Sequence, residues 1–238
     1  MADVADGVVG QVYTRPSAQA GSRYMTLPPQ HRQLIDGPAG ALEVLVEAPP
    51  QIAGPVCVIC HPHPQYGGTL DNKVVYTLAR AAQGLGAPAV RFNFRGVGRS
   101  EGAFANAVGE VDDLLAVTAF ARARWPERPV HVAGFSFGAA VALRGHAAVG
   151  AESLLLVAPP AGMGYLEPAA APEVPWQVIH GRDDQLIALD VLQRWLQTVD
   201  PLAPLSVIDD ADHFFHGRLT PLREAAQAFW EPLWRAVP

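Results

Sequence analysis

The sequence predicts an α/β protein in which a mostly parallel β-sheet is covered on both faces by helices. The first observation is alternation: from residue 41 almost to the C-terminus, short apolar runs alternate with segments of helical periodicity. The second is that those runs are apolar and often β-branched, as in strands buried on both faces. The third is composition, because half of the 238 residues are hydrophobic and only 17% are charged, which suits one sizeable core.

The apolar runs are the candidate strands. In chain order they cover residues 41–48, 55–60, 87–94, 129–135, 153–159, 176–181 and 204–209. Residues 1–40 are instead rich in Gly, Pro and Ser, and we expect a loose N-terminal segment that can add an antiparallel edge strand. Because no repeat or composition break follows, residues 41–238 are predicted to form a single domain.

Helical patterns separate most of these runs. In residues 71–86 the apolar side chains form one helical stripe, with Asp71 or Asn72 as the N-cap and glycine at the end. The other helices are expected at 110–125 and 188–199, directly after Gly138, and from Thr220-Pro221 to Pro232, which should end or kink the last one.

Charge and hydropathy exclude several partners. The formal net charge is -6 and no run of Lys or Arg could follow a phosphate backbone, so no nucleic acid is expected. The N-terminus shows no basic start before an apolar stretch, and no apolar run approaches the roughly 18 residues of a spanning helix. We therefore expect a cytoplasmic protein that does not contact membranes. The spacing of Phe229, Trp230, Leu233 and Trp234 is typical of a core helix but leaves monomer and homodimer open.

The two cysteines stand in Cys57-x-x-Cys60-His61, which formally matches the attachment signature of c-type haem. The surrounding run reads as a buried strand, however, and residues three apart on a strand point to opposite faces. The two thiols would then diverge and could share neither a haem nor a disulfide. We interpret both as buried small apolar residues.

Two segments match the pattern Gly-x-Ser-x-Gly. A nucleophile in this pattern needs a strand running directly into it and a helix starting directly after it, because the sharp turn lifts the hydroxyl above the sheet edge. Ser136, in GFSFG, has both neighbours, and we predict it as the catalytic nucleophile. Ser100, in GRSEG, is separated from the nearest strand and is predicted to be a loop serine that hydrogen-bonds local backbone.

A serine hydroxyl needs a base that is itself oriented by a carboxylate, and the downstream sequence supplies both. Asp183 and Asp184 directly follow the sixth candidate strand, and His213 and His216 follow the seventh. Loops at the carboxyl ends of parallel strands gather catalytic groups, so both pairs are well placed.

The motifs GFSFG, HGRDD and ADHFF fall where the α/β-hydrolase superfamily carries nucleophile, acid and base, and the chain from about residue 40 onward resembles that superfamily. The resemblance implies a triad of Ser136, Asp184 and His213, since the acid usually stands three residues after the glycine of an HG turn. The segment 158–176 is too short for a large helical cap. The chain is thus similar to small cap-less serine esterases and to dienelactone-hydrolase-like proteins, although the latter carry Cys in place of Ser136.

The stretch CHPHPQYGG resembles the superfamily loop that supplies half of the oxyanion hole. Because proline has no N–H, the candidate donors of this loop are the backbone amides of His63, Gln65 and Tyr66. The resemblance favours His63, paired with the N–H of Phe137.

His61 and His63 also have the spacing of metal ligands, but no second ligand set follows, so neither a metal nor an organic cofactor is expected. We interpret His61 as a buried, hydrogen-bonded loop anchor. Arg95, in a segment that resembles a recurrent Arg-Gly loop of the superfamily, is expected to fix loop geometry.

These inferences predict a serine hydrolase that cleaves a small carboxylic ester through an acyl-enzyme. Hydrolysis of an amide or peptide, as in relatives of prolyl oligopeptidase, or of a thioester is the enzymatic alternative. A non-catalytic module that binds a ligand or partner is the alternative of another class, since fold does not dictate function.

Overall fold

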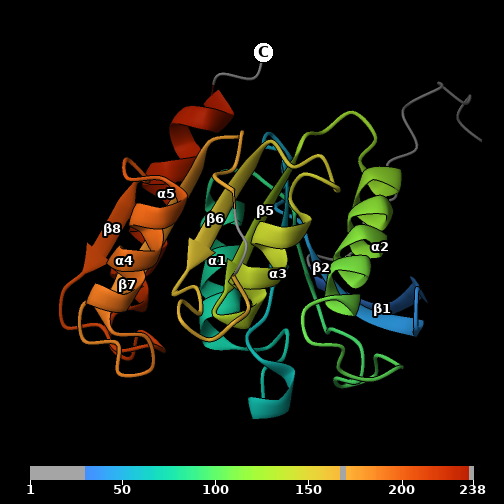
Figure 1. Ribbon diagram of the computed structural model, residues 1–238. Helices are drawn as coiled ribbons and strands as arrows, with labels where there is room; N and C mark the ends of the chain where they lie inside the picture. Colours follow the sequence, from blue (N-terminus) through green and yellow to red (C-terminus); the bar gives the residue numbers. More distant parts are fainter. Residues whose placement is uncertain (1–29, 167–169, 236–238) are drawn as a thin grey trace, which may run out of the picture.

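The structure, a computed structural model, describes residues 30–166 and 170–235 and contains one eight-stranded sheet flanked by helices (Figure 1). The strands are β1 (Gln30–Gly37), β2 (Gly40–Glu47), β3 (Val56–Cys60), β4 (Ala89–Phe92), β5 (Val130–Phe135), β6 (Ser153–Val157), β7 (Trp176–Gly181) and β8 (Leu205–Ile208).

The strand order is β1-β2-β4-β3-β5-β6-β7-β8. Strands β3 to β8 pair in parallel, whereas β1 pairs antiparallel with β2 and β2 pairs antiparallel with β4. The predicted fold class is confirmed. Strand β1 is an antiparallel edge strand that lies within the segment 1–40; residues 1–29 of that segment lie outside the described residues.

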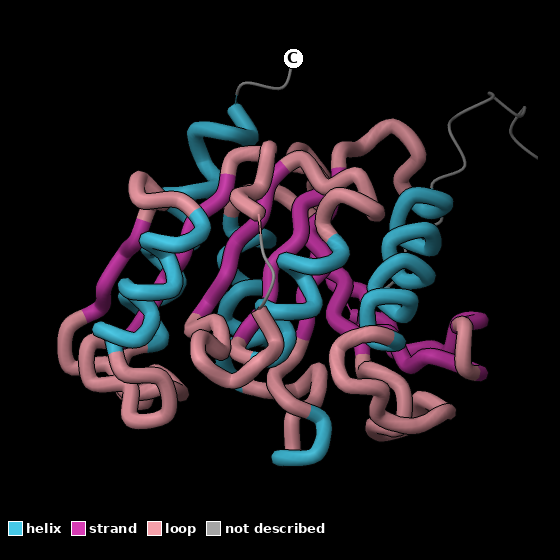
Figure 2. The backbone as a smooth tube through the Cα atoms, in the orientation of Figure 1, coloured by secondary structure: helices cyan, strands magenta, loops and turns pink. Residues whose placement is uncertain are grey.

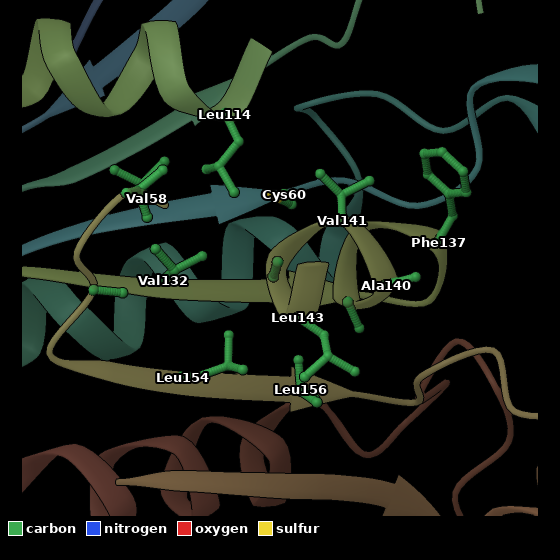
Figure 3. Packing of buried hydrophobic residues seen from close by; sticks show 14 of the residues in the cluster. Val58, Cys60, Leu114, Val132, Phe137, Ala140, Val141, Leu143, Leu154 and Leu156 are labelled. Carbon is green, nitrogen blue, oxygen red and sulfur yellow. The ribbon is translucent and has the colours of Figure 1, made fainter. Parts of the chain in front are cut away.

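The helices cover both faces of the sheet (Figure 1). Helices α2 (Gly109–Arg124), α3 (Phe137–Gly145) and α4 (Leu189–Val199) lie in front of the sheet in this view, and α1 (Lys73–Gly84) and α5 (Leu219–Arg235) lie behind it. Each face has its own core cluster. In the front cluster, Val58, Val132 and Leu154 of the sheet face Leu114 of α2 and Val141 of α3 (Figure 3).

The start of α1 follows its signal in the sequence. Asn72 caps α1, because its side-chain oxygen accepts hydrogen bonds from the N–H groups of Val74 and Val75. Helix α5 does not end at Pro232, which was one of the two outcomes expected there, but continues to Arg235. The indole of Trp234, beyond the proline, stacks on Trp230 and is buried, and this packing favours a continued helix over an end at Pro232.

The two cysteines lie on opposite faces of β3. Cys57 belongs to the rear core cluster and Cys60 to the front one, and both are free and fully buried. Burial raises the pKa of both thiols far above the ordinary range, because it disfavours the thiolate. Because the two thiols point to opposite faces of the sheet, they pack in separate cores and cannot bind one ligand together.

Loops that follow the parallel strands gather along one edge of the molecule, the lower edge in Figure 2. They include the short 3-10 helix η1 (Pro64–Tyr66) after β3. In the described part of the chain, no helix combines the length and apolarity needed to cross a membrane.

Candidate active site

Ser136 occupies a sharp turn between β5 and α3. Its backbone has φ 54° and ψ −121°, a conformation that is strained for any residue with a side chain. The turn brings main chains very close together, because a Cβ on Gly134 would lie 2.1 Å from the carbonyl oxygen of Gly138. A Cβ on Gly138 would lie 2.4 Å from the carbonyl oxygens of both Cys60 and His61. The two glycines of GFSFG thus permit the turn that presents Ser136.

Ser136, His213 and Asp184 form one hydrogen-bonded chain. The Nε2 atom of His213 lies 3.1 Å from Ser136 Oγ, and its Nδ1 lies 2.7 Å from Asp184 Oδ2. Because a carboxylate only accepts hydrogen bonds, Nδ1 carries a proton and Nε2 of the neutral ring is free to accept from the serine hydroxyl. His213 and Asp184 are both buried.

The Asp184 carboxylate is held by the loop that carries it. Its other oxygen, Oδ1, accepts hydrogen bonds from the N–H groups of Leu186 (2.9 Å) and Ile187 (2.8 Å). These bonds fix the carboxylate while Oδ2 remains directed at His213. The carboxylate is therefore oriented before any ligand binds.

The neighbouring candidates lie apart from this chain. Asp183 is exposed. His216 is exposed and places its Nδ1 2.6 Å from Asp212 Oδ2. The structure thus brings Asp184 and His213 to Ser136 and leaves Asp183 and His216 outside.

His180 is a residue near the site to which the sequence analysis gave no role. It is the last residue but one of β7 and is fully buried. Its Nε2–H donates to the carbonyl of Ile187 at 2.8 Å, and Nε2 lies 3.6 Å from Asp184 Oδ2. Burial lowers the pKa of His180, so the ring stays neutral beside the Asp184 loop. In the sequence, His180 is the first residue of the HGRDD motif that carries Asp184.

The loop after β3 brings His63 beside Phe137. Their rings are 4.9 Å apart, and in the described part of the chain neither backbone N–H donates to a protein acceptor. His63 Nδ1 accepts from the N–H of Gln65 at 3.2 Å, so the proton of the neutral ring sits on Nε2, which donates to Tyr165 Oη at 3.0 Å. Burial lowers the pKa of His63, which favours this neutral form.

His61 connects the same loop to the segment that follows β4. Its Nδ1–H donates to the carbonyl of Pro62 at 2.6 Å, and its Nε2 accepts from the N–H of Phe94 at 3.0 Å. The ring is fully buried, and burial lowers its pKa to about 4. Both nitrogens are thereby occupied, and within the described residues no group of three His, Cys, Asp or Glu side chains could hold a metal.

Ser100 and Arg95 hold the loop between β4 and α2. The Ser100 hydroxyl donates to the carbonyl of Asn93 at 2.7 Å and accepts from the N–H of Glu43 at 2.9 Å. The guanidinium of Arg95 forms a close pair with the buried carboxylate of Asp113. Both side chains are thus engaged within the loop and its neighbours.

A parallel sheet with a strand-turn-helix serine, and with an acid and a base on later loops, defines the class of α/β hydrolases. Comparison with known proteins supports this class. Residues 52–164 match the family model described as "Serine aminopeptidase, S33". An uncharacterised protein from Rickettsia prowazekii is 30% identical over 194 residues, which cover 76% of this chain and 80% of that protein.

Two solved structures are similar over most of both chains. An α/β serine hydrolase without a lid from Xanthomonas campestris is 40% identical, covers 89% of this chain and 99% of its own, and has a TM-score of 0.83. An α/β serine hydrolase homologue from Coxiella burnetii is 38% identical, with 85% and 98% coverage and a TM-score of 0.81. The chain belongs to the α/β serine hydrolases without a lid.

Proposed function

We propose that this protein hydrolyses carboxylic esters by acyl transfer through Ser136. The observation that carries the proposal is the hydrogen-bonded chain from Asp184 through His213 to the Ser136 hydroxyl. In this mechanism Ser136 Oγ attacks the ester carbonyl while His213 Nε2 takes its proton. Asp184 holds the Nδ1–H tautomer and stabilises the charged imidazolium that forms.

The negative oxygen of the tetrahedral intermediate would be bound by the N–H groups of Phe137 and His63. Two features support this assignment: the two residues are adjacent in space, and their amides have no acceptor in the described part of the chain. His213 then returns the proton to the leaving alcohol, and water cleaves the acyl-enzyme by the reverse sequence of proton transfers. Loss of one oxyanion donor typically costs about 10² to 10³ in turnover.

An amide or peptide substrate is the second candidate function. The observation in its favour is the match of residues 52–164 to a family model described as a serine aminopeptidase. An ester comes first because the segment 158–176 is too short for a large helical cap, so the sequence predicts an open site. We further propose, from sequence alone, a cytoplasmic monomer or homodimer that acts on a small molecule.

The test is hydrolysis of p-nitrophenyl esters from acetate to decanoate by the wild type, Ser136→Ala and Ser100→Ala. We expect Ser136→Ala to lose at least about 10³-fold in kcat, because the nucleophile is gone. Ser100→Ala is the matched control and should retain activity, since its hydroxyl bonds only the backbone of Glu43 in β2 and of Asn93 after β4. Activity that survives Ser136→Ala would overturn the mechanism, and cleavage of amides at rates matching esters would favour the peptidase alternative.

A further inference from the structure

Five rings form a continuous cluster beside Ser136, which we call the aromatic face. His63 is central, with ring centroids 4.7 Å from Tyr66, 4.9 Å from Phe104, 4.9 Å from Phe137 and 5.7 Å from Tyr165. Phe137 also lies 5.2 Å from Tyr165 and 5.6 Å from Phe104. The members come from the loops after β3, β4 and β6 and from the first residue of α3.

The aromatic face is partly open to solvent. Phe137 is buried at the start of α3, where it forms the base of the aromatic face and belongs to the front core cluster (Figure 3). His63, Phe104 and Tyr165 are half-buried, and the ring of Tyr66 is 86% exposed. Large aromatic side chains gathered and exposed in this way are typical of a binding surface.

Most of the loops of the aromatic face lie on the opposite side of the nucleophile from His213. Tyr165 is the exception, since its loop follows β6, which lies on the same side of β5 as β7 and β8. Ser136 follows the central strand β5. In the sheet order, β3 and β4 lie on one side of β5 and carry the loops of His63 and Phe104. Strands β7 and β8 lie on the other side and carry Asp184 and His213.

This geometry assigns directions to the parts of an ester, and the assignment rests on the proposed function. His213 must protonate the leaving alcohol, so the alcohol lies on the β7 and β8 side. The carbonyl oxygen points to the amides of His63 and Phe137. The acyl group occupies the remaining direction, toward the aromatic face.

We propose that the aromatic face binds the acyl group of the substrate and that this group is a neutral arylalkanoyl group. The rings are fixed in tilted and edge-on pairs, and a hydrogen bond joins His63 to Tyr165. A flat ring that adds to such a cluster gains aromatic contacts beyond its buried area and loses few rotatable bonds. A straight alkyl chain gains neither advantage.

A cationic acyl group is the competing ligand, because aromatic rings also attract cations. The nearby Glu110 carboxylate could favour it, since Oε2 lacks a hydrogen-bond partner in the described part of the chain. Glu110 is completely buried, however, and its Oε1 accepts from the N–H of Ala105. An ammonium group on the exposed side of the rings therefore cannot reach the carboxylate, and the structure favours the neutral group.

The first experiment compares p-nitrophenyl esters that share one leaving group and nine acyl carbons: 3-phenylpropanoate, 3-cyclohexylpropanoate and nonanoate. The p-nitrophenyl ester of phenylalanine adds an ammonium to the first of these. After correction for each ester's rate with hydroxide, we expect kcat/KM for 3-phenylpropanoate to exceed the other three values by about tenfold. Preference for nonanoate or for the phenylalanine ester would overturn the proposal.

The second experiment changes the face itself. Phe104→Leu and Tyr66→Leu should each lower kcat/KM for 3-phenylpropanoate by about five- to tenfold and for acetate by less than about twofold. Tyr66 is exposed, so its replacement tests the face without risk to folding. Tyr76→Leu is the control, since this exposed ring lies over the guanidinium of Arg91 and outside the face.

The acetate results separate the two proposals. If the enzyme hydrolyses acetate through Ser136 but shows no preference for 3-phenylpropanoate, the acyl-group assignment alone is overturned. The same holds if the Leu variants lose equal activity on acetate and on 3-phenylpropanoate. Absence of both acetate hydrolysis and labelling of Ser136 by a fluorophosphonate would overturn the proposed function and this inference with it.

Discussion

Buried histidines show at the residue scale how local environment sets protonation. The rings of His61 and His131 are buried, and burial lowers the pKa of each to about 4. Through Nε2, His61 joins the loop after β3 to the N–H of Phe94, and through Nδ1–H it bonds Pro62 within its own loop, so the neutral ring is part of the support for His63. Such a histidine links the stability of the fold to pH.

The stability of the protein should fall on mild acidification. In the unfolded chain these histidines bind a proton near pH 6.5, but in the folded chain they do so only near pH 4. The unfolded state therefore binds more protons across this window, and each histidine lowers the free energy of unfolding by about 2 kcal/mol between pH 7 and pH 5. Urea unfolding at the two pH values measures the difference.

His61→Gln tests the assignment to one residue. The amide oxygen can still accept from the N–H of Phe94, but the side chain no longer titrates. We expect the loss of unfolding free energy between pH 7 and pH 5 to shrink by about 2 kcal/mol. An unchanged loss would show that His61 does not contribute to the pH dependence.

At the element scale, the junction of β5 and α3 depends on how closely backbones approach. Helix α3 starts against the end of β3, where Gly138 faces the carbonyl oxygens of Cys60 and His61. The same junction sets the position of Ser136 and of the Phe137 amide. A change in this packing should therefore affect both stability and turnover.

Gly138→Ala should destabilise the fold by about 3 kcal/mol, because the added methyl would lie 2.4 Å from two backbone oxygens that cannot move independently. Gly164→Ala is the matched control. Its φ of +78° costs an alanine about 1 kcal/mol, but nothing lies within 4 Å of the added methyl. Chemical denaturation of both variants measures the difference, and equal losses would show that backbone approach at Gly138 is not limiting.

At the scale of the whole molecule, the sheet separates two cores and buries both thiols. Neither Cys57 nor Cys60 has any exposed surface, and burial strongly disfavours the thiolate that reacts with disulfide reagents. Their modification therefore requires the sheet to open.

We predict that neither thiol reacts with 5,5′-dithiobis(2-nitrobenzoic acid) in the native protein at pH 8 within an hour. Both should react rapidly in concentrated urea, where the sheet is unfolded. Absorbance at 412 nm follows the reaction. Rapid labelling of one thiol under native conditions would show that the face of β3 that carries it opens locally.

Periodicity in the sequence predicted most of the architecture. The seven strand candidates overlap β2 to β8, and the capping residue Asn72 stands at the start of α1. These features are local, because a continuous apolar run or a cap is read from adjacent residues. The sequence left open whether Pro232 ends the last helix, since the packing of Trp234 beyond it involves His131, far away in the chain.

The sequence by itself determined the α/β class, the strand-turn-helix setting of Ser136 and the two loops that carry acid and base candidates. Each of these features depends on a pattern of contiguous residues. Only the tertiary structure decided which candidates meet. In the structure, Asp184 and His213 form hydrogen bonds in one chain with Ser136, whereas Asp183 and His216 lie outside it. The rings of the aromatic face come together from separate loops. The physical reason is that such contacts join residues tens of positions apart, whose distances are set by the register of the sheet and not by neighbours along the chain.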